Sequence, residues 1–317
     1  MSVSSFNQAV VGSAAWLLKE AKGARIFDKS ILIFLRVIYL GSRVFLRIIL
    51  GKEKRNRIYA EREINFKDFL YRSIESLGLD KYVLLEFNVP KYDYKFYSLI
   101  TRKIENFLIE DMYNSMSAHE DDIIEHFSPK QGDIVVDIGA AFGFYTIISS
   151  KRVGTNGKVL AIEAHPSNFE MLNRNIKLNQ LTNVIPLNYA VYSKETKLKL
   201  YNNYSIMHER IGERTTKFVE ANANTLDYIL QQQQQVIHVN WIKIDVEGAE
   251  LEVLKGAQNV LSKSKDIALL IEVHGPDNYI PIIEFLNLYS FKIEFEKTYA
   301  SGDKHIILQK SGSCNRV

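Results

Sequence analysis

Short apolar runs alternate with amphipathic segments through the C-terminal part of the chain. The apolar runs occupy residues 133–139, 158–164, 183–191, 239–246 and 267–275. Segments with the periodicity of amphipathic helices follow four of these runs, at residues 142–154, 167–180, 250–261 and 276–289. Continuous apolar strands separated by helices are typical of a parallel sheet that is covered on both faces. The pattern therefore predicts a doubly wound, Rossmann-like α/β domain.

The predicted domain extends over residues 117–310 and has one edge that differs from the rest. Residues 291–297 and 305–310 are predicted to pair as an antiparallel edge, which makes a mostly parallel sheet of seven strands. An insertion between Val191 and His238 interrupts the alternation, and we expect a pair of extended segments within it. Doubly wound sheets bind their ligands at the carboxyl ends of the strands, so the functional site is expected there.

The residues before this domain lack the alternation. Residues 1–116 are predicted to form a mainly helical region with a β-hairpin at 82–100, and residues 311–317 a tail. Fifteen of the twenty residues from 31 to 50 are apolar, and three arginines that interrupt them share one helical face. Such a segment fits a helix that lies on a membrane surface through residues 25–57, a membrane-spanning helix, or a helix that packs on its own domain or on a second copy in a homodimer. The sequence leaves all three open.

Composition and charge narrow the class of protein. The 317 residues are 46% hydrophobic and 24% charged, which is typical of a globular chain and excludes a fibre or a disordered protein. Cys314 is the one cysteine, so an intramolecular disulfide is excluded and a reducing compartment is favoured. We predict a cytoplasmic location, with peripheral attachment at the inner face of the membrane as the alternative. The net charge of +3 comes from the N-terminal part, and since no basic stripe is interleaved with aromatic residues, no nucleic-acid partner is expected.

The turn after the first strand combines a carboxylate with two glycines, in VVDIGAAFGFYT at residues 135–146. Asp137 ends the strand, and Gly139, Ala140 and Gly143 follow before the expected helix. The glycines allow a tight turn and a close approach of the backbone to a ligand at the helix N-terminus. The spacing differs from the dinucleotide-binding fingerprint, which argues against a nicotinamide-dependent oxidoreductase. A carboxylate here suits a cationic or hydroxyl-bearing ligand better than a pyrophosphate.

Glu163 extends this candidate cofactor site. It ends the second strand, where an acidic residue can accept hydrogen bonds from both hydroxyls of a ribose. Together with Asp137, it fits a nucleoside that carries a positive charge, which points to S-adenosylmethionine. Ala190, at the end of the third strand, is then expected near the adenine.

Acidic side chains gather where the fourth and fifth strands end. Asp245 and Glu247 are two residues apart, so both face the same way along an extended strand. Glu250 is expected to cap the next helix, and Glu272 and His274 end the fifth strand. His274 is a candidate general base with Asp245 as the alternative, although a histidine bonded to backbone would fit the sequence equally well. Asp245, Glu272 and His274 could also converge on a divalent ion, but the histidines show no metal-ligand spacing, and we predict no metal site.

Taken together, these residues resemble the FkbM-type methyltransferase family. The matching stretches are GDIVVDIGAAFGFYT (132–146), VLAIEAHPSNFEMLNRNIKLN (159–179), NTLDYIL (224–230), KIDVEGAELEVLKGA (243–257) and IEVHG (271–275). The resemblance implies the class I S-adenosylmethionine-dependent fold and O-methylation of small molecules or glycans. It implies, position by position, that the cofactor is held by Asp137, Gly139, Gly143 and Glu163, and that Asp245 and Glu247 stand beside the methyl group.

Three positions bear on how closely the chain follows the family. Glu120 matches an acidic position that implies a contact with the methionine amino group. The family has asparagine where this chain has Ala141 and proline where it has Ala164. Both departures remove a rigidifying or hydrogen-bonding element from the cofactor loop.

The sequence therefore predicts a methyltransferase that acts on a hydroxyl of a small-molecule, glycan or lipid-linked acceptor. The alternative from another class is a membrane-associated interaction protein with a degenerate methyltransferase core, which the basic N-terminal region and Ala141 suggest. Binding of S-adenosylmethionine separates the two.

Overall fold

The computed structural model describes residues 84–89, 94–99, 122–202, 209–211, 218–233, 238–299 and 302–310. Four predictions lie outside the described residues: the segment 25–57, the domain boundary at 116–117, Glu120 and the tail 311–317. Strands β1 (Leu84–Val89) and β2 (Tyr94–Leu99) form a two-stranded sheet of their own within the range of the expected hairpin. In the part of the chain that is described, no helix has both the length and the apolar character to cross a membrane.

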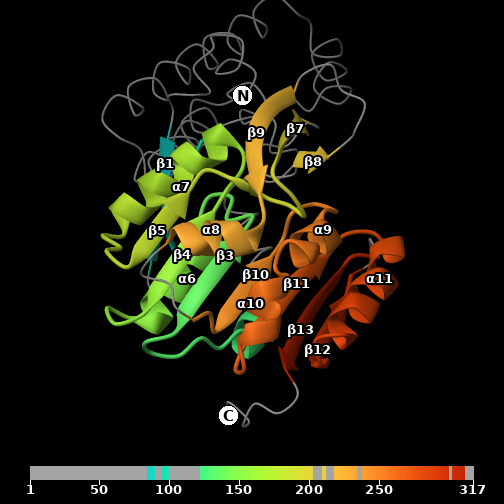
Figure 1. Cartoon of the computed structure of the whole chain (residues 1–317). Coiled ribbons are helices and arrows are strands. Elements are labelled where there is room, and N and C mark those ends of the chain that lie inside the picture. Colours follow the sequence, from blue (N-terminus) through green and yellow to red (C-terminus); the bar gives the residue numbers. More distant parts are fainter. Residues whose placement is uncertain are drawn as a thin grey trace, which may run out of the picture. The chain divides into compact units, whose positions relative to one another are not determined.

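A seven-stranded sheet forms the centre of the C-terminal unit, with the strand order β12-β13-β11-β10-β3-β4-β5 (Figure 1). Its strands are β3 (Ile134–Ile138), β4 (Lys158–Ile162), β5 (Val184–Leu187), β10 (Trp241–Ile244), β11 (Ala268–Val273), β12 (Phe291–Thr298) and β13 (Lys304–Lys310). Five neighbouring strands pair in parallel, in the order β11, β10, β3, β4 and β5. β13 pairs antiparallel with both β11 and β12. The predicted fold, a doubly wound and mostly parallel sheet with an antiparallel edge, is confirmed.

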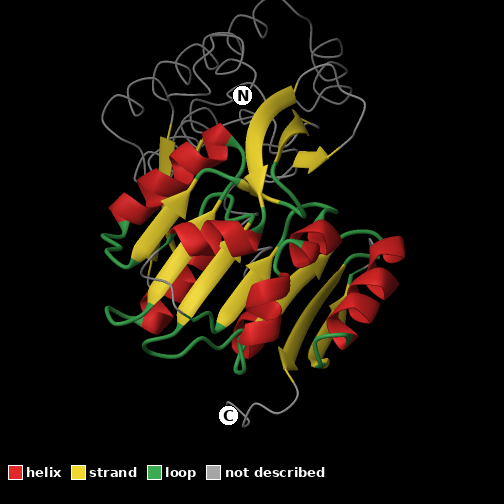
Figure 2. Ribbon diagram, in the orientation of Figure 1, coloured by secondary structure: helices red, strands yellow, loops and turns green. Residues whose placement is uncertain are grey.

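Helices cover both faces of this sheet (Figure 2). They are α6 (Phe144–Val153), α7 (Pro166–Leu178), α8 (Leu226–Gln232), α9 (Glu250–Lys255), α10 (Gln258–Lys263) and α11 (Pro276–Asn287). The main apolar core packs alternate strand residues against α8, α9, α10 and α11. The strand residues between them face the other way, where Ala161 packs against Leu172 of α7 and Trp241 contacts Phe127 edge to face. Parallel strands buried on both sides explain why their sequences are continuously apolar.

The third predicted strand, residues 183–191, divides between two sheets. β5 ends at Leu187, and the side chain of Asn188 donates a hydrogen bond of 2.8 Å to the backbone oxygen of Glu163. β6 (Ala190–Val191) then joins a second sheet with the order β6-β9-β7-β8, made with β7 (Thr196–Asn202), β8 (Glu209–Ile211) and β9 (Phe218–Asn224). β7 and β9 are the two extended segments expected in the insertion, and they pair antiparallel.

Two helix boundaries differ from the prediction for local reasons. The helix expected over 250–261 is two helices, α9 and α10, that separate at Gly256, where a Cβ atom would lie 2.1 Å from the backbone oxygen of Tyr192. The helix expected to open at Ser167 begins at Pro166, and the side chain of His165 accepts a hydrogen bond of 3.2 Å from the backbone amide of Ser167. His165 is an unusual N-cap, so the preferred serine was the natural prediction.

Candidate functional site

The carboxyl ends of β3 and β10 bring a buried lysine between two carboxylates. Asp137 and Lys243 are direct partners across these parallel strands, and Asp245 follows two residues after Lys243 on the same side. The Lys243 ammonium lies 3.0 Å from Asp245 Oδ2 and 3.8 Å from Asp137 Oδ1, and it donates a hydrogen bond of 3.3 Å to the backbone oxygen of Gly139. One cation therefore connects the end of the first core strand, the glycine turn and the acidic end of the fourth.

The charges of this group are set by burial and by each other. Burial raises the pKa of Asp137, and the ammonium of Lys243 together with the hydroxyl of Thr146, 2.5 Å away, offsets only part of that effect. Burial would lower the pKa of Lys243, but the carboxylates of Asp245 and Asp137 outweigh it and hold the pKa above its usual value. Burial also disfavours the charged form of Asp245, yet Lys243 and His274 keep its pKa below the usual value. Lys243 and Asp245 are therefore both charged at neutral pH and form an ion pair.

The glycine turn is packed tightly between the strands. Gly139 has a φ of +76°, and a Cβ atom there would lie 1.7 Å from the backbone oxygen of Asp245. Gly143 has a φ of +97° and is the N-cap of α6, with Leu172 where its Cβ would be. Ala141 has a φ of +47°, a conformation that glycine and asparagine adopt far more readily than alanine. This backbone explains why asparagine would be preferred at that position.

Glu163, at the end of β4, holds the glycine turn in place. Its Oε2 atom accepts a hydrogen bond of 2.8 Å from the backbone amide of Ala141, and its Oε1 atom accepts one of 2.8 Å from the amide of His165. Only 6% of the residue is exposed. These two backbone amides therefore orient the Glu163 carboxylate before a ribose binds to it. Ala190 is buried in the small sheet, packed with Ala164 beside it.

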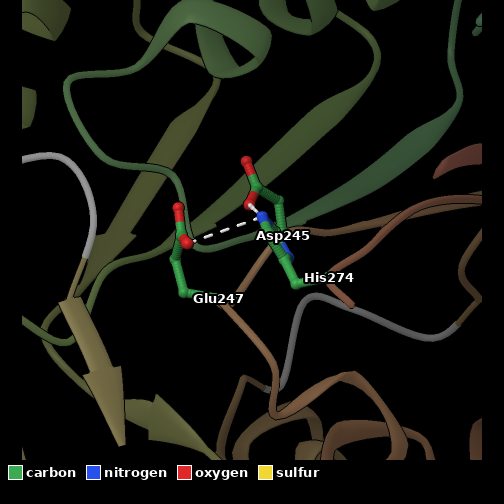
Figure 3. A group of neighbouring side chains, drawn as sticks. All are labelled: Asp245, Glu247 and His274. Carbon is green, nitrogen blue, oxygen red and sulfur yellow. Dashed lines mark ion pairs between the residues drawn. The ribbon is translucent and has the colours of Figure 1, made fainter. Parts of the chain in front are cut away.

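A second cluster lies on the other side of Asp245, around His274 (Figure 3). The Nε2 atom of His274 is 3.6 Å from Glu247 Oε2, 3.7 Å from Glu272 Oε1 and 3.9 Å from Asp245 Oδ1. The Nδ1 atom is hydrogen-bonded to Glu250 Oε1 at 2.9 Å. Glu247 has a φ of +55°, so a strained backbone presents this carboxylate to the histidine.

These four carboxylates decide the protonation of His274. Burial lowers the pKa of the imidazole, but the hydrogen bond to Glu250 and the charges of Asp245, Glu247 and Glu272 outweigh it and raise the pKa to about 10. In the protein without bound ligands, His274 therefore carries a positive charge at neutral pH.

The structure brings most of the predicted site residues to one edge of the sheet. Asp137 and Asp245 meet through Lys243, and Asp245, Glu247 and His274 form a single group. Sequence reasoning missed Lys243 and the contact of Glu250 with His274. Glu250 was expected to cap its helix, but the N-cap of α9 is Ala249 without a side-chain cap bond, and the Glu250 carboxylate instead accepts a hydrogen bond from the amide of Gly248, which precedes the helix.

A model of the methyltransferase FkbM domain matches residues 137–293 of the chain. A model of protein-L-isoaspartate(D-aspartate) O-methyltransferase matches residues 82–188. Both matches include the glycine turn and the end of β4, and the first also includes the ends of β10 and β11.

Curated relatives and a solved structure also resemble the chain. Hexuronic acid methyltransferase AglP of Haloferax volcanii is 26% identical over 186 residues, which are 56% of this chain and 71% of AglP. Methyltransferase sdnD of Sordaria araneosa is 29% identical over 156 residues, which are 38% of this chain and 59% of sdnD. The crystal structure of a methyltransferase FkbM from Methylobacillus flagellatus has a TM-score of 0.43 and 17% identity, with 57% of this chain and 44% of that chain covered.

Proposed function

Residues 137–293 belong to the methyltransferase FkbM domain family, and from this premise we propose that the chain methylates a hydroxyl oxygen of a small-molecule, glycan or lipid-linked acceptor. The predicted family, the S-adenosylmethionine cofactor and methyltransferase activity are confirmed at the level of the domain. The hydroxyl acceptor is the part of the proposal that goes beyond these confirmed predictions. It is supported by the acidic cluster at the ends of β10 and β11 and by the similarity to a hexuronic acid methyltransferase, a protein whose acceptor is a sugar acid.

The residues at the strand ends fit this cofactor. Asp137 Oδ1 is buried and has no hydrogen-bond partner in the described part of the chain, although the ammonium of Lys243 lies 3.8 Å away. When bound, S-adenosylmethionine supplies a methyl group activated by a positively charged sulfur atom. We assign its binding to the carboxylates of Asp137 and Glu163, the backbone of the glycine turn and, near the adenine, Ala190. The turn residues in this assignment are Gly139, Ala140 and Gly143. The contact of Glu120 with the methionine amino group stays a prediction, since this residue lies outside the described ones.

The acceptor hydroxyl is assigned to the side of Asp245 that faces away from Lys243. The Asp245 side chain is 27% exposed and that of Glu247 10%, whereas only 8% of His274 is exposed. Asp245 can therefore reach an acceptor while Lys243 fixes its other oxygen. Correct placement of a nucleophile can lower a barrier by about 7–11 kcal/mol, so positioning is the main contribution we assign to these residues. Asp245 and His274 are the two predicted proton acceptors, and His274 can serve only after it loses the proton that its raised pKa retains at neutral pH.

The experiment is a product analysis with the full chain. The protein is incubated with methyl-labelled S-adenosylmethionine and free or oligosaccharide-linked hexuronic acids, and the products are separated by mass spectrometry. A label that survives mild alkali and that fragmentation places on oxygen is a methyl ether and supports the proposal, because a methyl ester would be hydrolysed. Label found only in an alkali-sensitive ester, or on carbon or nitrogen, would overturn the hydroxyl acceptor while leaving the family assignment intact.

Location and assembly remain proposals. Contact of residues 25–57 with an anionic membrane surface predicts sedimentation of the full chain with anionic liposomes at low salt and its release at high salt. A homodimer predicts twice the chain mass in light scattering. If either result is not obtained, the corresponding proposal is wrong, and the assignment of the methyltransferase domain is unaffected.

A further inference from the structure

The cluster at the ends of β10 and β11 has the arrangement of a metal centre. One ligand atom each from Asp245, Glu247 and His274 lies within 4.8 Å of the other two, and Figure 3 shows the three side chains pointing toward a common region. Two carboxylates and one imidazole are a common ligand set for divalent metal ions.

The two distances from His274 Nε2 to the carboxylates of Glu247 and Asp245 are too long for hydrogen bonds and lie in the range of ligand separations around one ion. His274 Nε2 is 3.6 Å from Glu247 Oε2 and 3.9 Å from Asp245 Oδ1, whereas a hydrogen bond between such atoms is about 2.7–2.9 Å. Ligand atoms about 2.1 Å from one octahedral ion lie about 3.0 Å apart when adjacent and about 4.2 Å apart when opposite. Both observed distances fall between these limits.

His274 is held in the orientation that a metal ligand needs. Its Nδ1 atom is hydrogen-bonded at 2.9 Å to Glu250, a residue that is fully buried, while its Nε2 atom has no hydrogen-bond partner among the described residues. A carboxylate on one ring nitrogen that leaves the other facing the ion is the usual support for metal-bound histidine. Glu250 also accepts a hydrogen bond of 2.8 Å from the backbone of Gly248, which ties this support to the turn that carries Glu247.

The carboxylates around His274 outnumber the positive charges that the described residues offer to them. Four carboxylates contact His274, and two of them have another partner on their second oxygen: the Lys243 ammonium lies 3.0 Å from Asp245 Oδ2, and His305 Nε2 lies 3.2 Å from Glu272 Oε2. His274 by itself offers at most one positive charge to this group. A doubly charged ion that takes the place of the proton on His274 Nε2, as a ligating imidazole requires, would balance it better.

We propose that Asp245, Glu247 and His274 bind a divalent metal ion, with Glu250 as the residue that orients His274. The ligand set favours an ion that accepts oxygen and imidazole together, such as Mn²⁺. Three protein ligands leave positions for oxygen atoms of water or of an acceptor. If the proposed function holds, the acceptor is one with two adjacent oxygen donors, such as a vicinal diol or a hydroxy acid, since such a molecule can chelate the ion while one hydroxyl is methylated.

The test measures Mn²⁺ binding by the full chain in the absence of cofactor and acceptor, so that it is independent of the proposed activity. After removal of metals with a chelator, Mn²⁺ is titrated while electron paramagnetic resonance reports the free ion and calorimetry the heat of binding. The proposal predicts one Mn²⁺ per chain. Glu247→Gln should weaken binding by about a hundredfold or more because it removes a ligand, and Glu250→Gln by about 10–100-fold because it removes a ligand's support.

Glu252→Gln is the matched control. Glu252 lies on the same helix as Glu250, but its carboxylate contacts Ser193 and Lys255, so Mn²⁺ binding should be unchanged. Circular dichroism confirms that each variant is folded. Absence of stoichiometric binding in the wild-type chain, or equal binding by Glu247→Gln and the control, would show that His274 alone neutralises the carboxylates and would overturn the proposal. Methylation without any effect of metal would remove only the role in acceptor binding.

Discussion

Replacing Lys243 with methionine is expected to destabilise the fold by about 3–5 kcal/mol, the usual effect of breaking a buried ion pair. The Lys243 side chain is 5% exposed, and its ammonium lies 3.0 Å from Asp245 and 3.8 Å from Asp137. At an effective dielectric constant of about 20, each contact is worth about 4–6 kcal/mol before the cost of desolvation. Methionine has a similar length, so packing changes little. Two carboxylates then remain at the strand ends without their cation.

The assay is urea unfolding of the full chain, followed by circular dichroism with a metal chelator present. Lys255→Met is the control, because Lys255 pairs with Glu252 at the surface, with side chains 43% and 29% exposed, and should cost less than about 1 kcal/mol. Adding Asp137→Asn to Lys243→Met should recover part of the loss, since it removes one of the two charges left unpaired. A loss below about 1 kcal/mol for Lys243→Met, or no recovery in the double variant, would refute the assigned role of Lys243.

Two further substitutions test the glycine turn. Gly139→Ala should destabilise the chain by more than about 3 kcal/mol, because its Cβ would overlap the backbone of Asp245, whereas Gly132→Ala, also at positive φ but with no atom within 4 Å, should cost only about 1 kcal/mol; thermal or urea unfolding compares them directly. Ala141→Asn should stabilise the chain by up to about 1 kcal/mol, since asparagine tolerates a φ of +47° better than alanine, and a lower unfolding midpoint in the same assay would contradict this.

The fold could be predicted from the sequence because its strands are buried on both faces. Each apolar run became a strand of the central sheet, and the last two segments became the antiparallel edge. Errors occurred where a tertiary contact overrides local preference. The approach of Gly256 to Tyr192 divides one expected helix, and the hydrogen bond from Asn188 to the end of β4 helps to end β5 earlier than its sequence indicates.

The candidate site could be predicted in its residues but not in its pairings. Asp137, Glu163, Asp245 and His274 were recognised because acidic residues at the ends of parallel strands share one edge of the sheet. The lysine that Asp137 and Asp245 share could not be derived from spacing, since the pairing of β3 with β10 joins residues 137 and 243 across the chain. One signal was available: Lys243 lies in an apolar strand, two residues before Asp245 and on the same side.

The residue type of His274 did not reveal the pKa that this side chain has in the fold. A histidine at a strand end suits a general base when its pKa stays near 6.5. Here Glu250 and three more carboxylates raise the pKa to about 10, and only the fold reveals that they meet. The general-base role stays a prediction, and the geometry around Nε2 is what led us to a metal ion instead.

The cofactor site itself is tested most directly by calorimetric titration of the full chain with S-adenosylmethionine. We predict saturable binding at one site per chain, weakened about tenfold or more by Glu163→Gln, because loss of a charged hydrogen-bond acceptor is worth about 1.5–3 kcal/mol. Glu170→Gln, which changes an exposed acid on α7 paired with Arg174, should bind as the wild type does. Absence of binding by the wild-type chain, or equal affinity in the two variants, would contradict a nucleoside held at the ends of β3 and β4.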